Sequence, residues 1–323
     1  MVACDERAKR WFCVIILALF MGGSAFGQVS ELNRKWIYWD DIFEENPVEI
    51  HDISIPSLIS TPPAVRWHSM FSQLPSDWSR GAGLTIRSES IPSIVGIGVV
   101  TFGLLQTDHN TWLATRRLCR SSDTFHDAAG YAVALGDGKL HLAIAGTFAC
   151  YGWLFDDSRA LRTASQTMEA FIATGVTVQV LKRVTGRESP IEATHHSGRW
   201  KFFPHPSNYQ RNQARYYAFP SGHISTAMAT LTVIAENYPE QRWIKPVGYT
   251  LVGALGFGLV SRGMHWYSDL PLGVALGYLF GKLAAHPDAQ AFAASSKDSG
   301  VSVVVLPALD GEGGGRLSLA VGF

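Results

Sequence analysis

This sequence has few cysteines and no excess of charge of either sign. It contains 4 cysteines in 323 residues, and its 27 basic and 27 acidic side chains give a formal net charge of zero. Proteins that bind nucleic acid usually carry a basic excess, so the charge balance argues against a nucleic-acid partner. Cys4 and Cys13 lie in a predicted leader, which leaves Cys119 and Cys150. These two cysteines could form a disulfide in an oxidising compartment. Cys150 lies in an apolar run typical of a buried thiol, however, so the sequence does not decide between a disulfide and free thiols.

Strand-like alternation is also missing before Pro287, where apolar segments instead have helical lengths. Gly, Pro and Asp residues separate these segments, as is typical of helix ends. The segments lie at about 92–106, 124–135, 140–155, 158–184, 221–237, 241–262 and 266–285. This pattern predicts an all-α fold, a helical bundle of about six core helices.

Long hydrophobic runs are scarce. A run of about 15 apolar residues makes about 22 Å of helix, which is short of a hydrocarbon core of about 30 Å. Residues 244–261 are nearly uncharged, however, and Gly273, Gly277 and Gly281 form a stripe that favours close helix packing. We therefore expect a globular periplasmic domain, with a membrane surface as a candidate partner.

Residues 1–27 resemble a secretory signal peptide. A basic region with Arg7, Lys9 and Arg10 precedes the apolar run from Trp11 to Met21, and small residues precede a candidate cleavage site before Gln28. The pattern predicts export from the cytoplasm, with an uncleaved anchor as the alternative.

The rest of the chain divides by composition. Residues 28–90 are Trp-rich and contain several prolines, which predicts an irregular arm or lid, and residues 91–290 hold the helical domain. A polar linker, 291–300, leads to a tail at 301–323 in which two alternating segments flank a Gly-rich stretch. That pattern predicts a C-terminal β-hairpin tail, which we expect to pack on the body of the chain.

The chemistry concentrates first at Phe219-Pro220-Ser221-Gly222-His223, which opens an apolar helical run. Ser221 is a good cap for the first helical turn, and Gly222 lets a ligand approach the backbone closely. The free N–H groups of a helix start favour an anion such as phosphate. His223 is then placed to donate or accept a proton beside that anion.

Two further patches complete the set. A long helical run ends with Lys182 before a Gly and Pro break, and a later stretch carries His265 and Asp269. If residues 265–269 are helical, these two side chains share one face. A carboxylate there holds one imidazole nitrogen as N–H and leaves the other as a nucleophile.

These three patches resemble the type 2 phosphatidic acid phosphatase family, which includes class A bacterial acid phosphatases and vanadium haloperoxidases. The family pattern is Lys-x6-Arg-Pro, then Pro-Ser-Gly-His, then Ser-Arg-x5-His-x3-Asp. Here Pro-Ser-Gly-His is complete at 220–223, and the His-x3-Asp half of the third block is present at 265–269. The similarity covers roughly residues 92–285, including the order of the apolar helices.

The resemblance implies a role for each matching residue. His265 would attack phosphorus and form a phosphohistidine, His223 would protonate the leaving group, and Asp269 would orient His265. Lys182, Ser221 and Gly222 would hold the phosphoryl oxygens. The resemblance implies no metal or other cofactor for this chemistry, and vanadate in the same pocket for a haloperoxidase.

Two family arginines are absent. Ser189 and Leu259 stand at their positions, although Pro190 is kept. Fixed cations supply much of the catalysis of phosphoryl transfer, so their loss matters. Arg187, from the loop, and Arg262, one near-turn from Leu259, are candidates to bind phosphate instead. The loop at roughly 185–220 also carries His195 and His196, a pair more typical of a solvated loop than of a metal site.

The sequence thus predicts a metal-independent phosphatase acting outside the cytoplasm on a phosphomonoester or a lipid (pyro)phosphate. A vanadium-dependent haloperoxidase is the alternative enzyme. An inactive member of the family that binds phosphate or lipid is the alternative from another class, because both arginines are replaced.

Overall fold

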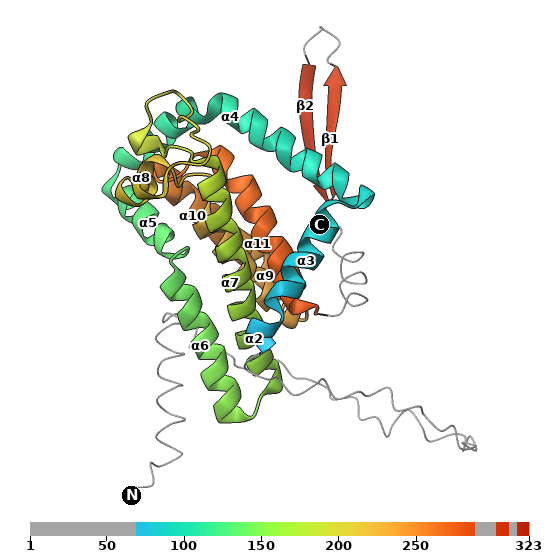
Figure 1. Ribbon diagram of the computed structural model, residues 1–323. Helices are drawn as coiled ribbons and strands as arrows, with labels where there is room; N and C mark the ends of the chain where they lie inside the picture. The colour runs from blue at the N-terminus through green and yellow to red at the C-terminus, as the bar shows by residue number, and fades with distance from the viewer. Residues whose placement is uncertain (1–68, 288–301, 310–314, 323) are drawn as a thin grey trace, which may run out of the picture. The chain divides into compact units, whose positions relative to one another are not determined.

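The computed structural model describes residues 69–287, 302–309 and 315–322. The predicted signal peptide, the predicted linker and most of the predicted arm lie outside these residues. The described part is mainly helical, so the predicted all-α class is confirmed there (Figure 1). Its α-helices are α2 (Ser69–Ser72), α3 (Leu74–Thr85), α4 (Ile91–Arg120), α5 (Asp123–Ala134), α6 (Gly138–Phe155), α7 (Ser158–Thr185), α8 (Pro206–Arg211), α9 (Gly222–Asn237), α10 (Ile244–Ser261) and α11 (Leu270–Ala285).

Helix α9 lies at the centre of the bundle and packs against α7, α10 and α11. Small side chains make the contact between α7 and α9, where Ala170 meets Ala229 and Val233. Larger ones, including Ile224, Leu255 and Leu259, fill the contact between α9 and α10. Helix α4 crosses the end of the bundle at which α7 ends and α9 begins (Figure 1). This end also carries the candidate site.

The helix bounds follow the sequence signals closely. Helix α7 ends where Gly186 adopts the left-handed conformation (φ 52°), and Ser221 caps α9. Helix α4 differs, because it continues to Arg120 instead of ending near 106. Residues 107–120 contain no Gly or Pro, so nothing local stops the helix, even though they are more polar.

The described end of the predicted arm is also helical, contrary to the irregular structure expected there. Pro75 lies in the first turn of α3, where proline is well tolerated. Leu74 and Trp78 pack against Ala173, Phe280 and Leu283, and Trp78 Nε1 donates to the carbonyl of Ala173 at 3.3 Å. This part of the arm is therefore built into the core.

The glycine stripe of α11 packs directly on α9. A Cβ at Gly277 would lie 2.2 Å from the carbonyl oxygen of Ser225, and one at Gly273 would lie 2.8 Å from that of Ser221. The stripe therefore lets two helix backbones approach without a side chain between them.

We expect Gly277→Ala to destabilise the protein by about 1–3 kcal/mol or more, because the methyl group has no room against the α9 backbone. The matched control is Gly253→Ala in α10, where an added Cβ meets no atom within 4 Å. The control should be neutral or slightly stabilising, since alanine is the better helix former. Thermal unfolding of the two variants measures the difference, and equal midpoints would contradict the packing argument.

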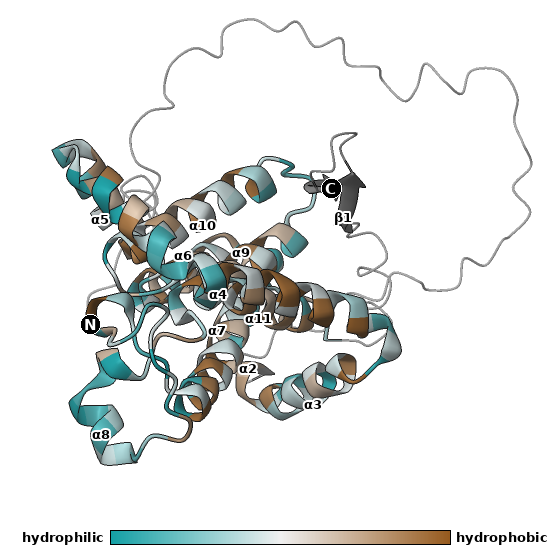
Figure 2. Ribbon diagram, turned by 90° about the horizontal axis from the view of Figure 1, so that it is seen from above, coloured by the Kyte–Doolittle hydropathy of each residue, from teal (hydrophilic) through white to brown (hydrophobic). Residues whose placement is uncertain are grey.

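Two described helices are long and apolar enough to cross a membrane by length and composition, Ser88–Arg120 and Ile244–Ser261. None of the apolar window in the first is buried, against 39% in the second. Figure 2 shows the apolar colouring of α4, where Val95, Val99 and Phe102 are exposed. The apolar window of α4 thus holds no fully buried residue, and much of its apolar surface is exposed among the described residues.

Beyond the helices, strand β1 (Ser302–Leu309) pairs antiparallel with β2 (Gly315–Gly322), and Ser302 lies opposite Gly322. The stretch between them lies outside the described residues. Cys119 is buried and Cys150 is exposed, and both are free thiols.

Candidate active site

The cationic end of α7 supplies Lys182. Its side chain is almost fully buried, and its Nζ lies 5.1 Å from the ring centre of Tyr217. A Cβ at Gly222 would lie 3.7 Å from the same nitrogen. Lys182 therefore lies beside the first turn of α9, as the predicted phosphate cradle requires.

The first turn of α9 has the predicted form. Ser221 is fully buried, and its hydroxyl oxygen accepts from the N–H of Ile224 at 3.5 Å. Its own N–H donates to the carbonyl of Asp269 at 3.0 Å, which ties this helix start to the His265 segment. His223 is half-buried against the turn between α5 and α6, where a Cβ at Gly136 would lie 2.6 Å from that of His223.

The structure corrects the local conformation at His265. Residues 265 and 266 are not helical, and only Tyr267–Asp269 form a short 3₁₀ turn before α11. The i, i+4 pair therefore does not lie on a helix face. Gly263, with φ 70°, ends α10 and reverses the chain, and Pro271 starts α11. His265 and Asp269 still meet, at 3.5 Å between Nδ1 and Oδ2, because the turn folds back on itself.

His265 is fully buried, and its two ring nitrogens have different surroundings. Nδ1 lies 2.7 Å from the carbonyl of Ala218 and near Asp269, so two acceptors hold the proton on this nitrogen. Nε2 is buried and has no hydrogen-bond partner in the described part of the chain. Burial lowers the pKa of His265, with Asp269 opposing the shift. The ring is thus neutral at pH 7 and directs an unprotonated nitrogen away from Asp269.

His223 and Lys182 complete the pocket around that nitrogen. The rings of His223 and His265 are 6.2 Å apart, and Tyr217 lies 5.9 Å from His265. Burial lowers the pKa of His223 to about 4, with smaller effects from the neighbouring His265 and Lys182. Burial also lowers the pKa of Lys182 to about 8, against the attraction of Asp269. At pH 7 the pocket therefore holds one cation and two neutral imidazoles.

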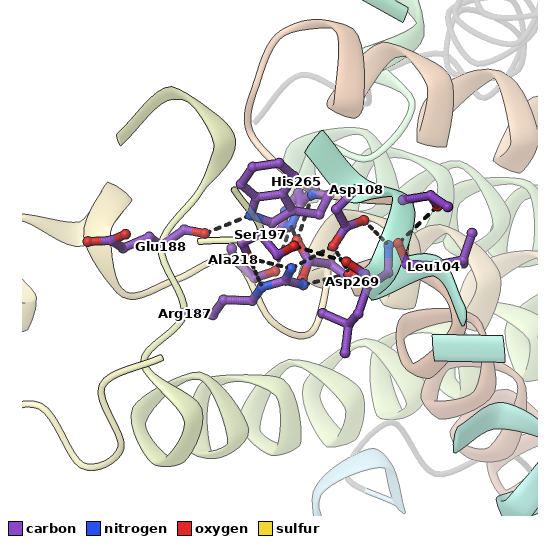
Figure 3. Close-up of polar contacts among 12 residues, drawn as sticks. Leu104, Asp108, Arg187, Glu188, Ser197, Ala218, His265 and Asp269 are labelled. Atoms are coloured by element: carbon purple, nitrogen blue, oxygen red, sulfur yellow. Dashed lines mark hydrogen bonds and ion pairs between the residues drawn. The ribbon is translucent and has the colours of Figure 1, made fainter. Parts of the chain in front are cut away.

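Arg187 is fully buried on the other side of Asp269 (Figure 3). Its Nη1 donates to Asp269 and to the hydroxyl of Ser268, its Nη2 donates to Asp108, and both Nε and Nη2 donate to the carbonyl of Ser197. These contacts use all five N–H groups of the guanidinium. The structure thus places Arg187 behind the histidine and pairs it with two carboxylates. The sequence had suggested instead that Arg187 binds phosphate.

Asp108 of α4 is the charged residue of this cluster that the sequence did not single out. One of its oxygens accepts from Arg187 at 2.7 Å and from the Ser268 hydroxyl at 2.5 Å, and the other accepts from the Ser268 N–H at 3.2 Å. It is 1% exposed. The only sequence signal was a lone carboxylate in an apolar helix, because its partners are 79 or more residues away in the chain.

The loop between α7 and α9 gives the site its remaining parts. Residue 187 pairs with both Trp200 and Tyr217 through isolated bridges, and the N–H of Ala218 donates to the carbonyl of Arg187. This pairing presents the Ala218 carbonyl to His265 Nδ1. Through these contacts the loop forms part of the surroundings of His265.

The structure places the other predicted cation elsewhere. Arg262 is exposed at the end of α10, and its Nη2 donates to the carbonyl of His126 at 3.1 Å. It contacts none of Lys182, His223 and His265 through the hydrogen bonds, ion pairs and ring contacts of the described residues. Leu259 is fully buried in the core, and Ser189 is fully buried in the loop. Neither position offers a cation to the site.

Comparison with known proteins agrees with the motifs. Residues 164–290 match the family model of the PAP2 superfamily. The resemblance to this superfamily is confirmed. The matched part holds Lys182, the α9 start and the His265 turn, whereas α4 and Asp108 lie outside the PAP2 match.

Curated relatives and a solved structure are also similar. A lipid A 1-phosphatase from Porphyromonas gingivalis is 36% identical over 67 residues, which are 20% of this chain and 15% of that protein. One from Rhizobium etli is 31% identical over 115 residues, 35% of this chain and 45% of that protein. The chain thus spans less than half the length of these relatives. A transmembrane PAP2-type phosphatidylglycerolphosphate phosphatase from Bacillus subtilis has a TM-score of 0.43 at 17% identity, covering 61% of this chain and 96% of that one.

Proposed function

We propose that this protein is a metal-independent phosphatase of lipid phosphates that works through a phosphohistidine at His265. The match to the PAP2 superfamily and the similarity to lipid A 1-phosphatases support a hydrolase of this class. One observation in the site carries the proposal. The buried His265 has its Nδ1 proton fixed by two acceptors, and its Nε2 is left without a partner beside His223.

The reaction follows from this placement. Nε2 of His265 attacks phosphorus, the bond to the leaving oxygen breaks, and His223 gives that oxygen its proton. Positive charge develops on the phosphorylated ring, and Asp269 stabilises it through Nδ1–H. His223, now neutral, then takes a proton from a water molecule that attacks phosphorus, and this step releases inorganic phosphate and His265. Lys182 and the first turn of α9 hold the phosphoryl oxygens throughout.

A second candidate is a family member that binds phosphate without turnover. The specific observation in its favour is the shortage of cations, because Leu259 and Ser189 are buried without charge and Arg187 pairs with carboxylates. Such a protein would bind phosphate or vanadate and release no product.

The proposed place of work is a membrane outside the cytoplasm. The two apolar helices and the exposed apolar surface of α4 support membrane association. Export rests on the predicted signal peptide at 1–27, which lies outside the described residues.

The deciding experiment measures phosphate release from lipid and soluble phosphates in the presence of a metal chelator, with the full chain in detergent or vesicles. We expect release from lipid phosphates, inhibition by vanadate, and an acid-labile phosphoprotein trapped during turnover. Vanadate binding without any release would favour the binding protein. A strict requirement for an added metal ion would contradict the proposed mechanism.

We expect kcat/KM, which reports the ionisation of the free enzyme, to fall in two steps as the pH rises. His223 must be protonated to act as the acid, and its pKa of about 4 makes that form scarcer as the pH rises from 4. Lys182 must be charged, and its pKa of about 8 predicts a second loss above that pH. We therefore expect the highest kcat/KM on the acidic side.

The substrate phosphate also titrates, at about pH 6. The profile of His223→Gln separates the two effects, because that variant should lose the step due to the histidine and keep the step due to the substrate. A parent profile that rises between pH 5 and 8 would contradict the assignment of His223 as the acid.

A further inference from the structure

A second pocket lies beside the candidate active site, and its rim is cationic. Its lining includes the buried Cys119, Ser261 and Gly263, together with arginines from α4 and from the end of α10. We call it the arginine pocket. It is lined by Trp112, Arg116, Cys119, Arg120, His126, Ile191, Ser261, Arg262 and Gly263.

The arginine pocket is rich in hydrogen-bond donors and poor in acceptors. No carboxylate lines it, and Arg116, Arg120 and Arg262 form no ion pair with any described residue. Arg116 lies over the ring of Trp112, at 5.4 Å from its centre. The indole N–H of Trp112 is itself buried without an acceptor in the described part of the chain. Guanidinium groups and an unpaired N–H around one cavity suit a phosphate-type anion, which accepts from several donors at once.

Closeness in the sequence and two contacts connect this pocket with the His265 segment. Ser261, Arg262 and Gly263 lie two to four residues before His265 in the chain. The ring of Trp112 packs edge to face on that of Trp266 at 5.9 Å. The carbonyl of Gly263 accepts from the N–H of Ile191 at 3.2 Å, in the loop that also carries Arg187. The two sites therefore share a wall.

Arg262 occupies a different place in the structure from Leu259, which stands at the position of the family arginine. Leu259, at the position of the family arginine, faces the core among Ile224 and Leu255. Arg262 lies three residues later, where α10 ends, and its side chain turns toward His126. The charge is thus moved from the reacting histidine to the neighbouring pocket.

We propose that the arginine pocket is a second anion site, which binds a phosphate-type group while the first is held at His265. The inference rests on the proposed function in one respect, that the substrate is a lipid phosphate. If both anions belong to one molecule, the substrate is a lipid with two phosphate groups. If they do not, the pocket takes a free phosphate.

The test compares Arg116→Gln, which removes a charge from the pocket, with Arg117→Gln, which removes an exposed charge from the next position of α4 that does not line it. Kinetics are measured for a lipid with one phosphate group and for a lipid with two, in the same neutral vesicles. We expect Arg116→Gln to raise KM about tenfold for the two-phosphate lipid only, with kcat for the one-phosphate lipid unchanged. Arg120→Gln is the second variant, should Arg116→Gln fail to fold.

Calorimetric titration of inorganic phosphate, with vanadate already bound, tests the pocket without relying on turnover. Binding by the parent that weakens in Arg116→Gln, with equal kinetics on both lipids, would support a site for a free anion. The titration measures phosphate binding even if the parent has no phosphatase activity. It can therefore support or contradict the second anion site independently of the proposed function. Equal phosphate binding and equal kinetics in the parent and Arg116→Gln would overturn the proposal. An equal loss in Arg117→Gln would also overturn it, because general surface charge would then explain the effect.

Discussion

Replacement of His265 by asparagine should lower kcat by on the order of 10⁴-fold or more, because the variant loses the atom that attacks phosphorus. Asparagine is chosen over alanine because its amide N–H can replace Nδ1–H as the donor to the carbonyl of Ala218. The fold should therefore survive. Steady-state phosphate release measures kcat, and the acid-labile phosphoprotein should disappear in the same variant.

The matched control is His286→Asn. His286 follows α11, and its Nε2 lies 2.9 Å from Oε2 of Glu236, away from the reacting histidines. We expect its kcat to stay close to that of the parent. If His265→Asn kept more than a small fraction of the parent's turnover, His265 would not be the nucleophile, and the chemistry would have to begin on another group.

The second large effect is expected from Asp108→Asn, which should lower kcat by on the order of 100-fold with little change in KM. Asp108 shares Arg187 with Asp269, so the guanidinium does not belong to Asp269 alone. Without the Asp108 charge, Arg187 would neutralise the charge of Asp269 more fully. Asp269 would then stabilise the charged His265 ring less. The Ser268 hydroxyl, which donates to Asp108, would also lose its carboxylate acceptor.

A structural loss must be separated from this positioning effect. Asp77→Asn is the matched control, because Asp77 is also 1% exposed and pairs with an arginine, Arg80, at 2.6 Å. Both variants weaken an ion pair of a buried carboxylate and should lower the melting temperature. Only Asp108→Asn should lower kcat at a temperature where both are folded, and it should still bind vanadate. Equal kcat in the two variants would show that Asp108 has only a structural role.

The sequence determined the local structure of the segments that carry the candidate site. Gly186 ends α7 just after Lys182, and Ser221 caps α9 just before His223, because both features depend only on neighbouring residues. The Pro-Ser-Gly-His block and the pair of His265 with Asp269 were readable for the same reason. The short 3₁₀ turn at 267–269 could not be predicted from the sequence. The chain reversal at Gly263 sets the direction in which the following residues continue.

The tertiary structure alone decided what each arginine does. Arg187 and Arg262 looked equivalent in the sequence, as two cations close to the positions of missing ones. Arg187 meets Asp108 and Asp269 from 79 and 82 residues away, and Arg262 meets the carbonyl of His126 from 136 residues away. Local periodicity carries no information about such contacts, because they depend on how α4 and α5 pack against the rest of the bundle. The sequence by itself therefore determined the candidate reacting groups and their order along the chain, and the packing of helices decided which charges surround them.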